Sequence, residues 1–172
     1  DYNNGQAKIR ILPNGNQSLV SKQFAVYKLF QAQISNTSIN YFYNEEYKDV
    51  IINKEVADEK ITPKTLLIVV DTHKTSYVEA PELLEKTNQV AIIDHHRRSA
   101  DYIENATLTF QEVYASSAAE LVTELIQYTE VNVELKKVEA ESLYAGIIMD
   151  TKSFTFKTGV RTFEAAAYLR KC

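Results

Sequence analysis

The chain has 172 residues, a net charge of −4, 45% apolar residues and 24% charged residues, which is ordinary for a globular domain. Its one cysteine, Cys172, excludes an intrachain disulfide, and neither a signal peptide nor an apolar run long enough to span a bilayer is present. The acidic balance disfavours non-specific binding of a long nucleic acid, because such binding needs a basic surface.

The first half of the chain predicts buried parallel strands. Residues 66–70 and 90–93 are continuous β-branched runs of the kind found in parallel sheets. Residues 80–86 between them predict a short helix with a proline in its first turn. Weaker candidates are strands at 9–12 and 39–43, with a helix at 19–33.

The second half is predicted to be mostly helical. A capping-box pattern at 117–120 begins one helix, and further helices are predicted at 136–148 and 162–170. The side chains expected to face inward are Leu121, Val122, Leu125, Ile126, Leu143, Tyr144, Ile147 and Ile148. The alternation predicts an α/β fold, a three-layer open sheet that is mainly parallel, with helices on both faces. No repeat or linker is visible, so residues 1–172 are predicted to form one domain.

Acidic residues and histidines cluster directly after the two predicted strands. Asp71 and Asp94 each follow a strand, and the three histidines of the chain, His73, His95 and His96, lie within two residues of one of these acids. Ligands of open α/β sheets bind beyond the carboxyl ends of the strands. Carboxylate and imidazole ligands together suit manganese, iron or zinc better than calcium. The alternative is that these side chains cap strand ends and bond to the backbone.

Several segments resemble the motifs of DHH-family phosphoesterases in their order and spacing. The segment Ile93–Arg98, with the sequence IDHHRR, resembles the signature of that family. The other matching segments are 70–73, 114–124, 145–154 and 157–166. Across 64–171 the chain is most similar to the GdpP-type cyclic-di-AMP phosphodiesterases, rather than to RecJ exonucleases or pyrophosphatases.

The resemblance implies a role for each matching residue. Two manganese ions would be bridged by Asp71, and His95 and Asp150 would complete the ligands of one ion. His96 would contact the scissile phosphate, so His96 and Asp71 are the two predicted catalytic residues. Asp94 would orient the histidines. The implied reaction is metal-dependent hydrolysis of a phosphodiester, which opens a cyclic dinucleotide to its linear form.

The chain departs from the family pattern at the first motif, which supplies one histidine and two aspartates. In the best register Asn14, Ser18 and Val20 occupy these three positions, and no Asp, Glu or His occurs between Tyr2 and Asn44. Neutral side chains cannot replace the missing negative charge. We therefore expect one manganese ion or none, and hydrolytic activity that is weak or lost.

Three arginines, Arg97, Arg98 and Arg161, are predicted to contact phosphate, with solvated surface arginines as the alternative. Ser116 and Ser117 would cap a helix or receive phosphate at its N-terminus. The expected ligands are a cyclic dinucleotide or a short linear dinucleotide, and no long nucleic acid. We expect no membrane contact by residues 1–172. A homodimer is compatible with the resemblance. It further implies a fragment of a longer multidomain protein, membrane-tethered, with this domain on the cytoplasmic side.

Two other functions compete with the first. The alternative is an inactive pseudo-phosphodiesterase that serves as a nucleotide-sensing or interaction module, which the neutral first motif favours. An exonuclease acting on single-stranded nucleic acid is disfavoured by the charge of the chain and by the segments at 114–124 and 157–166.

Overall fold

The computed structural model describes residues 9–11, 52, 54–129 and 133–172. The predicted helix at 19–33 and strand at 39–43 lie outside this part of the chain. The described elements are β1 (Ile9–Ile11), α4 (Lys54–Lys60), β2 (Leu66–Val70), the 3₁₀ helices η1 (Thr75–Tyr77) and η2 (Pro81–Glu85), β3 (Gln89–Asp94), β4 (Leu108–Gln111), α5 (Ala118–Tyr128), α6 (Lys137–Asp150) and α7 (Val160–Leu169).

The strands form one sheet in the order β1-β2-β3-β4. β2, β3 and β4 are parallel, whereas β1 pairs with β2 in the antiparallel direction. The sheet is therefore mainly parallel, as predicted. β4 was not predicted, because this edge strand is partly exposed and lacks the continuous apolar run that marks a central parallel strand.

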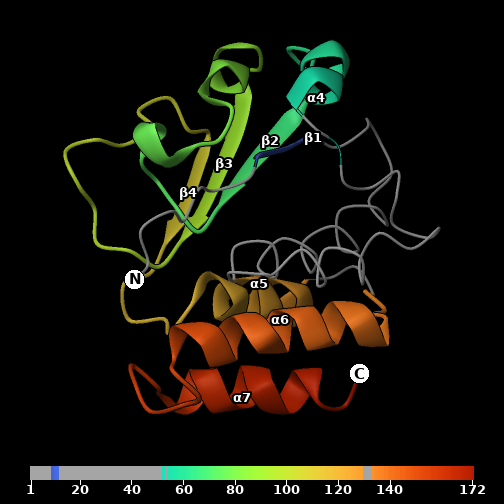
Figure 1. Ribbon diagram of the computed structural model, residues 1–172, viewed down its shortest axis with the longest axis vertical. Helices are drawn as coiled ribbons and strands as arrows, with labels where there is room; N and C mark the ends of the chain where they lie inside the picture. The colour runs from blue at the N-terminus through green and yellow to red at the C-terminus, as the bar shows by residue number, and fades with distance from the viewer. Residues whose placement is uncertain (1–8, 12–51, 53, 130–132) are drawn as a thin grey trace.

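Alternate side chains of β2 and β3 enter two separate hydrophobic cores. Leu67 and Val69 point to a core shared with α4 and η2, which contains Ala57 and Leu83. Ile68 points to the other face, whose core is formed with α5, α6 and α7. The period of two along a strand places successive side chains on opposite faces, so the sheet lies between helical layers (Figure 1). This confirms the predicted α/β architecture.

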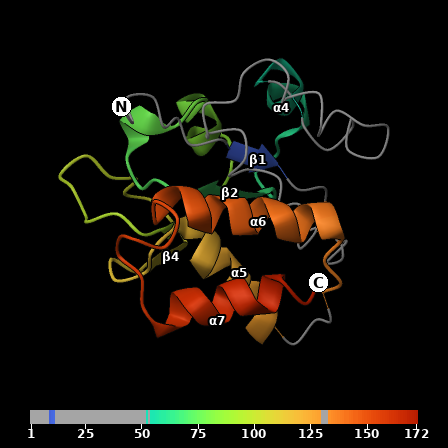
Figure 2. The same cartoon turned by 60° about the horizontal axis from the view of Figure 1, so that its bottom comes forward.

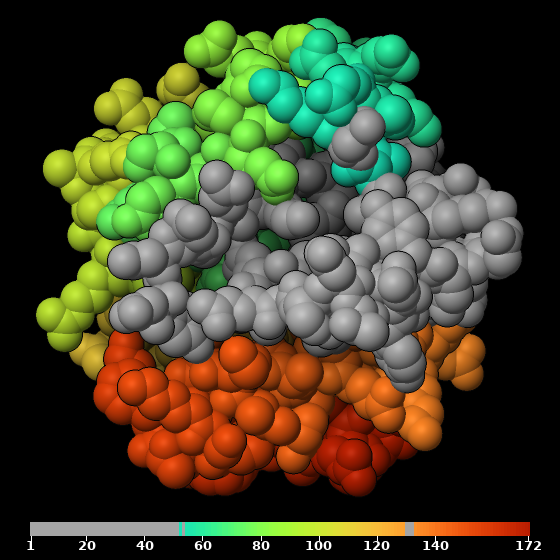
Figure 3. All heavy atoms as spheres, viewed as in Figure 1, coloured from blue at the N-terminus to red at the C-terminus, as the bar shows by residue number. Residues whose placement is uncertain are grey.

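Helices α5, α6 and α7 all lie on the same side of the sheet. α7 lies on the far side of α6 from the strands (Figure 1), and the turned view shows α5 behind α6 and α7 (Figure 2). In the space-filling view, α6 and α7 form one side of the molecule, and the segments around α4 and η2 form the other (Figure 3). None of the helices in the described part of the chain has the length and hydropathy that a transmembrane span requires.

Most of the predicted helix positions are confirmed, with two corrections. Ser117 caps α5, since its hydroxyl accepts a hydrogen bond from the amide of Glu120. Leu125 is 43% exposed, so its predicted inward orientation was wrong: it lies at the margin of the stripe that Val122 and Ile126 bury. The predicted short helix at 80–86 is the 3₁₀ helix η2, with Pro81 at its start.

Candidate active site

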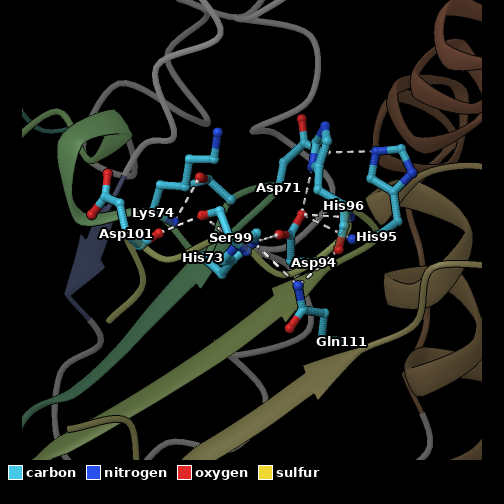
Figure 4. A network of polar contacts seen from close by, with 10 residues as sticks. Asp71, His73, Lys74, Asp94, His95, His96, Ser99, Asp101 and Gln111 are labelled. Carbon is cyan, nitrogen blue, oxygen red and sulfur yellow. Dashed lines mark hydrogen bonds and ion pairs between the residues drawn. The ribbon is translucent and has the colours of Figure 1, made fainter. Parts of the chain in front are cut away.

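Three parallel strands end at the same edge of the sheet, and each is followed or terminated by a polar residue. Asp71 follows β2, Asp94 ends β3 and Gln111 ends β4. The amide of Asp71 donates to the carbonyl oxygen of Ile93 (2.9 Å), which extends the ladder by one residue. Asp71 has a φ of 72°, a left-handed conformation that aspartate tolerates better than most residues and that is common at functional sites. Figure 4 shows the resulting group of side chains.

His95 lies between two carboxylates that belong to different elements. Its Nε2 is 3.4 Å from Oδ1 of Asp71 and 3.8 Å from Oδ2 of Asp150, the last residue of α6. The three side chains are only 11–14% exposed. Nδ1 of His95 is buried and makes no hydrogen bond within the described part of the chain. The structure therefore brings together the three residues that the sequence predicted as metal ligands.

The distance of 3.4 Å between Nε2 of His95 and Oδ1 of Asp71 is one that two ligands of a single cation can have. Ligand atoms of Asp71, His95 and His96 all lie within 4.8 Å of one another. Bonds from a metal to imidazole or carboxylate are about 2.0–2.2 Å long, so two ligands of one ion lie roughly 3–3.5 Å apart. The mixed oxygen and nitrogen donors suit a transition metal. The residues present thus fit a divalent cation, with His96 adjoining the predicted ligands.

Asp94 is fully buried, and both of its carboxylate oxygens are engaged. Oδ1 accepts hydrogen bonds from Nδ1 of His96 (2.7 Å) and from the amides of His95 (2.9 Å) and His96 (3.3 Å). Oδ2 accepts from Nδ1 of His73 at 2.5 Å. Burial alone would raise the pKa of Asp94, but the hydrogen bonds from His96 and His73 outweigh burial and hold the pKa below its usual value. This pattern is that of a carboxylate that orients two imidazoles.

The half-exposed ring of His96 is oriented through Nδ1 by Asp94 and lies 4.4 Å from the ring of His95, centre to centre. Its carbonyl oxygen accepts a hydrogen bond from the Gln111 side-chain amide at 2.7 Å. Gln111 was not recognised in the sequence, because only the end of β4 brings it to this edge. A prediction of the strand that ends at residue 111 would have placed Gln111 at this edge.

The three predicted phosphate-binding arginines have different surroundings. Arg97 and Arg98 are exposed and directly follow His96, and the guanidinium of Arg98 lies 4.2 Å from the ring centre of Tyr102. Arg161 instead makes two hydrogen bonds to the carboxylate of Glu124, at 2.7 and 2.6 Å. These bonds raise the pKa of Arg161. Arg161 is therefore paired within its own chain.

Ser116 and Ser117 both stabilise the start of α5. Ser117 is the N-cap, and Ser116 donates from its amide (3.2 Å) and its hydroxyl (2.5 Å) to Oε2 of Glu120. These contacts support the capping interpretation. The first-motif positions, Asn14, Ser18 and Val20, lie outside the described residues.

Comparison with known proteins places this geometry in a family. A profile described as "DHH family, N-terminal domain" matches residues 18–147, more than half of the chain. The chain belongs to the DHH family. The predicted signature at 93–98, which contains Asp94, His95 and His96, lies within the match.

Curated relatives of this DHH-family chain include cyclic-di-AMP phosphodiesterases. It is 51% identical over 129 residues to the cyclic-di-AMP phosphodiesterase PdeA of Listeria monocytogenes, covering 73% of this chain and 20% of the relative. It is 54% identical over 119 residues to the cyclic-di-AMP phosphodiesterase GdpP of Geobacillus thermodenitrificans, covering 69% and 18%. The chain thus spans about a fifth of the length of these relatives.

A solved structure agrees with the fold. An exopolyphosphatase-related protein from Bacteroides fragilis superposes with a TM-score of 0.64 at 20% sequence identity. The superposition covers 77% of this chain and 39% of the other chain. At this level of identity the likeness supports the α/β architecture of the DHH-family chain and says nothing of its substrate.

Proposed function

We propose that this DHH-family chain is the metal-dependent phosphodiesterase domain of a protein that hydrolyses cyclic-di-AMP, and that its activity is weak. The observation that carries the proposal is the placement of His95 between Asp71 and Asp150, at the carboxyl edge of the sheet. This geometry occurs in a chain that is about half identical to cyclic-di-AMP phosphodiesterases over most of its length.

In this proposal Asp71, His95 and Asp150 would hold manganese. The bound cation would supply positive charge to the oxygens of the diester. Asp94 holds the ring of His96 through Nδ1, so Nε2 is the nitrogen that would meet the scissile phosphate. The exposed Arg97 and Arg98 follow His96 directly and would contact phosphate oxygens.

Weak activity follows from the composition of the first motif. Residues 2–44 contain no Asp, Glu or His, so this segment offers no charged ligand to a second ion. The three remaining ligands can define one site, but one oxygen of the displacement would then lack its positive partner. We expect one bound manganese ion and slow hydrolysis of a cyclic or short linear dinucleotide. We assign the domain to the cytoplasmic side of a larger protein.

The first test is manganese-dependent hydrolysis of cyclic-di-AMP by the longest natural form of the protein. We expect slow opening to the linear dinucleotide, dependent on added manganese and abolished by His95→Ala. A Lys137→Ala variant, changed at an exposed residue at the start of α6, should retain the rate of the unmodified protein. Equal hydrolysis by the His95→Ala variant would contradict the proposal.

A second function is favoured by the neutral first motif: a nucleotide-sensing or interaction module without catalysis. It predicts no turnover at any manganese concentration, together with measurable equilibrium binding of cyclic-di-AMP. Calorimetric titration of the same protein in the presence of manganese distinguishes the two functions, because a phosphodiesterase would consume its ligand.

A further inference from the structure

A buried Ser–His–Asp arrangement adjoins the candidate metal site. Nδ1 of His73 lies 2.5 Å from Oδ2 of Asp94, and Nε2 of His73 lies 3.2 Å from Oγ of Ser99. His73 is 2% exposed and Asp94 is fully buried. The geometry is like that of a nucleophilic triad, but the hydroxyl of Ser99 donates to the carbonyl oxygen of Asp101 at 2.6 Å. The proton of Ser99 is therefore directed away from His73, and the arrangement is not that of an activated serine.

The hydrogen bonds fix the tautomer of His73. A carboxylate can only accept, so Nδ1 of His73 carries the proton that is shared with Asp94. Nε2 is then an acceptor, and the amide of Ser99 donates to it at 3.0 Å. The side-chain amide nitrogen of Gln111 lies 3.2 Å from Nδ1, but in this tautomer both atoms are donors, so this approach is only a contact. Both ring nitrogens of His73 are thus used by the protein itself.

His73 joins the loops that follow two neighbouring strands. It lies three residues beyond β2, whereas Asp94 ends β3 and Ser99 lies in the loop after β3. The carbonyl oxygen of His73 also accepts from the amide of Ile103 at 2.9 Å, which is a second tie to the same loop. Figure 4 shows His73, Asp94 and Ser99 next to the candidate ligands. The segment 97–98 is therefore held at both ends by one network.

We propose that His73 is a positioning residue that couples, through Asp94, the ring of His96 and the backbone of His95 to the placement of Arg97 and Arg98, through Ser99. Nδ1 of His73 contacts the carboxylate that holds the His96 ring, and Nε2 accepts from the amide of Ser99, which follows the arginine segment 97–98. The effect of His73 on catalysis rests on the proposed function, because it acts on the site to which that function is assigned. The contacts themselves exist without a metal or a substrate.

Two substitutions separate the two halves of the network. His73→Asn can place an amide N–H near the position of Nδ1, which keeps the bond to Asp94 and loses the acceptor for Ser99. His73→Gln can place its amide oxygen near the position of Nε2, which keeps the acceptor and loses the bond to Asp94. We expect His73→Gln to weaken manganese binding about tenfold or more, as for other residues that orient metal ligands. We expect His73→Asn to keep manganese affinity and to raise KM for cyclic-di-AMP.

Manganese binding is measured on the full chain by electron paramagnetic resonance, and KM is measured by hydrolysis. Glu79→Gln, at an exposed residue in the connection between β2 and β3, is the matched control and should change neither quantity. Equal loss of manganese affinity in the Asn and Gln variants, or no loss in either, would overturn the proposed division.

A third measurement needs neither metal nor turnover. In the metal-free chain labelled with ¹⁵N-histidine, we expect His73 to be protonated at Nδ1 and unprotonated at Nε2. The His96 imidazole resonances should move in the His73→Gln variant and stay in place in the His73→Asn variant. The Nε2-protonated tautomer of His73 would overturn the inference even if the enzyme is active. If the His96 resonances change as expected but the chain has no phosphodiesterase activity, the proposed function is refuted and the role of His73 in orienting His96 is not.

Discussion

Single residues with a left-handed backbone are concentrated just after the candidate ligand Asp150. Lys152, Ser153, Phe154 and Lys157 all have φ between 48° and 64°. Each such residue costs about 1–2 kcal/mol when it is not glycine. Buried Thr151 stabilises the turn, because its hydroxyl donates to the carbonyl oxygen of Ile147 (2.7 Å) and accepts from the amide of Phe154 (3.0 Å). This turn ends α6 directly after Asp150.

Ser153→Gly should therefore stabilise the protein. Ser153 is exposed and has a φ of 59°, so glycine removes the steric cost without removing buried contacts. The unfolding free energy should rise by about 0.5–1 kcal/mol, since the greater freedom of glycine in the unfolded chain offsets part of the gain. Urea denaturation measures the change. Glu164→Gly, at an exposed position inside α7, should lower the unfolding free energy by about 1 kcal/mol. A loss of stability in both variants would show that the turn is not strained at Ser153.

At the scale of elements, a buried carboxylate fastens α7 to α5. Glu120 is 1% exposed, and its Oε2 accepts hydrogen bonds from the hydroxyls of Ser116 (2.5 Å) and Thr162 (2.7 Å). Thr162 lies in the first turn of α7, so the contact joins two helices. Arg161 and Glu124 add a second, more exposed link between the same helices. Glu120 was predicted only as part of a capping box, and its contact with Thr162 was not foreseen.

Glu120→Ala should destabilise the packing of α7. The substitution leaves the buried Ser116 and Thr162 hydroxyls without their acceptor, so the unfolding free energy should fall by about 2–3 kcal/mol. Thermal unfolding followed by circular dichroism measures the effect. Glu141→Ala, which removes an exposed glutamate from α6, should change stability by less than about 0.5 kcal/mol. Equal effects of the two substitutions would show that the Glu120 contacts contribute nothing net.

At the level of the whole molecule, the sheet joins two cores, and among the described residues these cores share no buried side chain. Leu143 of α6 is 1% exposed in the core beneath α5 and α7. Leu83 of η2 is 1% exposed in the core on the opposite face. Because both cores are built on β2 and β3, loss of packing on either face removes support from the strand ends that position Asp71 and Asp94.

Leu143→Ala and Leu83→Ala should each lower the unfolding free energy by about 2–5 kcal/mol, because each leaves a cavity in a closed core. Both variants should unfold in a single transition, with tertiary and secondary signals lost together. Leu125→Ala, at the partly exposed position on α5, should cost less than about 1 kcal/mol. Two separate transitions in urea would show that the two cores unfold independently.

The features that could be predicted from the sequence are those that repeat along the chain. The β-branched runs at 66–70 and 90–93 predicted two parallel strands, and the helical spacing predicted α5, α6 and α7. The rule that ligands gather at the carboxyl ends of such strands then placed Asp71 beside His95. These features are local, because they depend on side-chain period and on the residue that ends an element.

Most contacts between residues far apart in the chain were visible only in the folded molecule, although the family resemblance had already paired His95 with Asp150. His73 bonds Asp94 across 21 positions, and Thr162 bonds Glu120 across 42. The half-exposed edge strand β4, with Gln111 at its end, and the antiparallel pairing of β1 also came from the fold. A sequence pattern reflects the period of one helix or strand. These contacts depend instead on how several elements pack together, because the side chains of both cores must fit closely on the two faces of the same sheet.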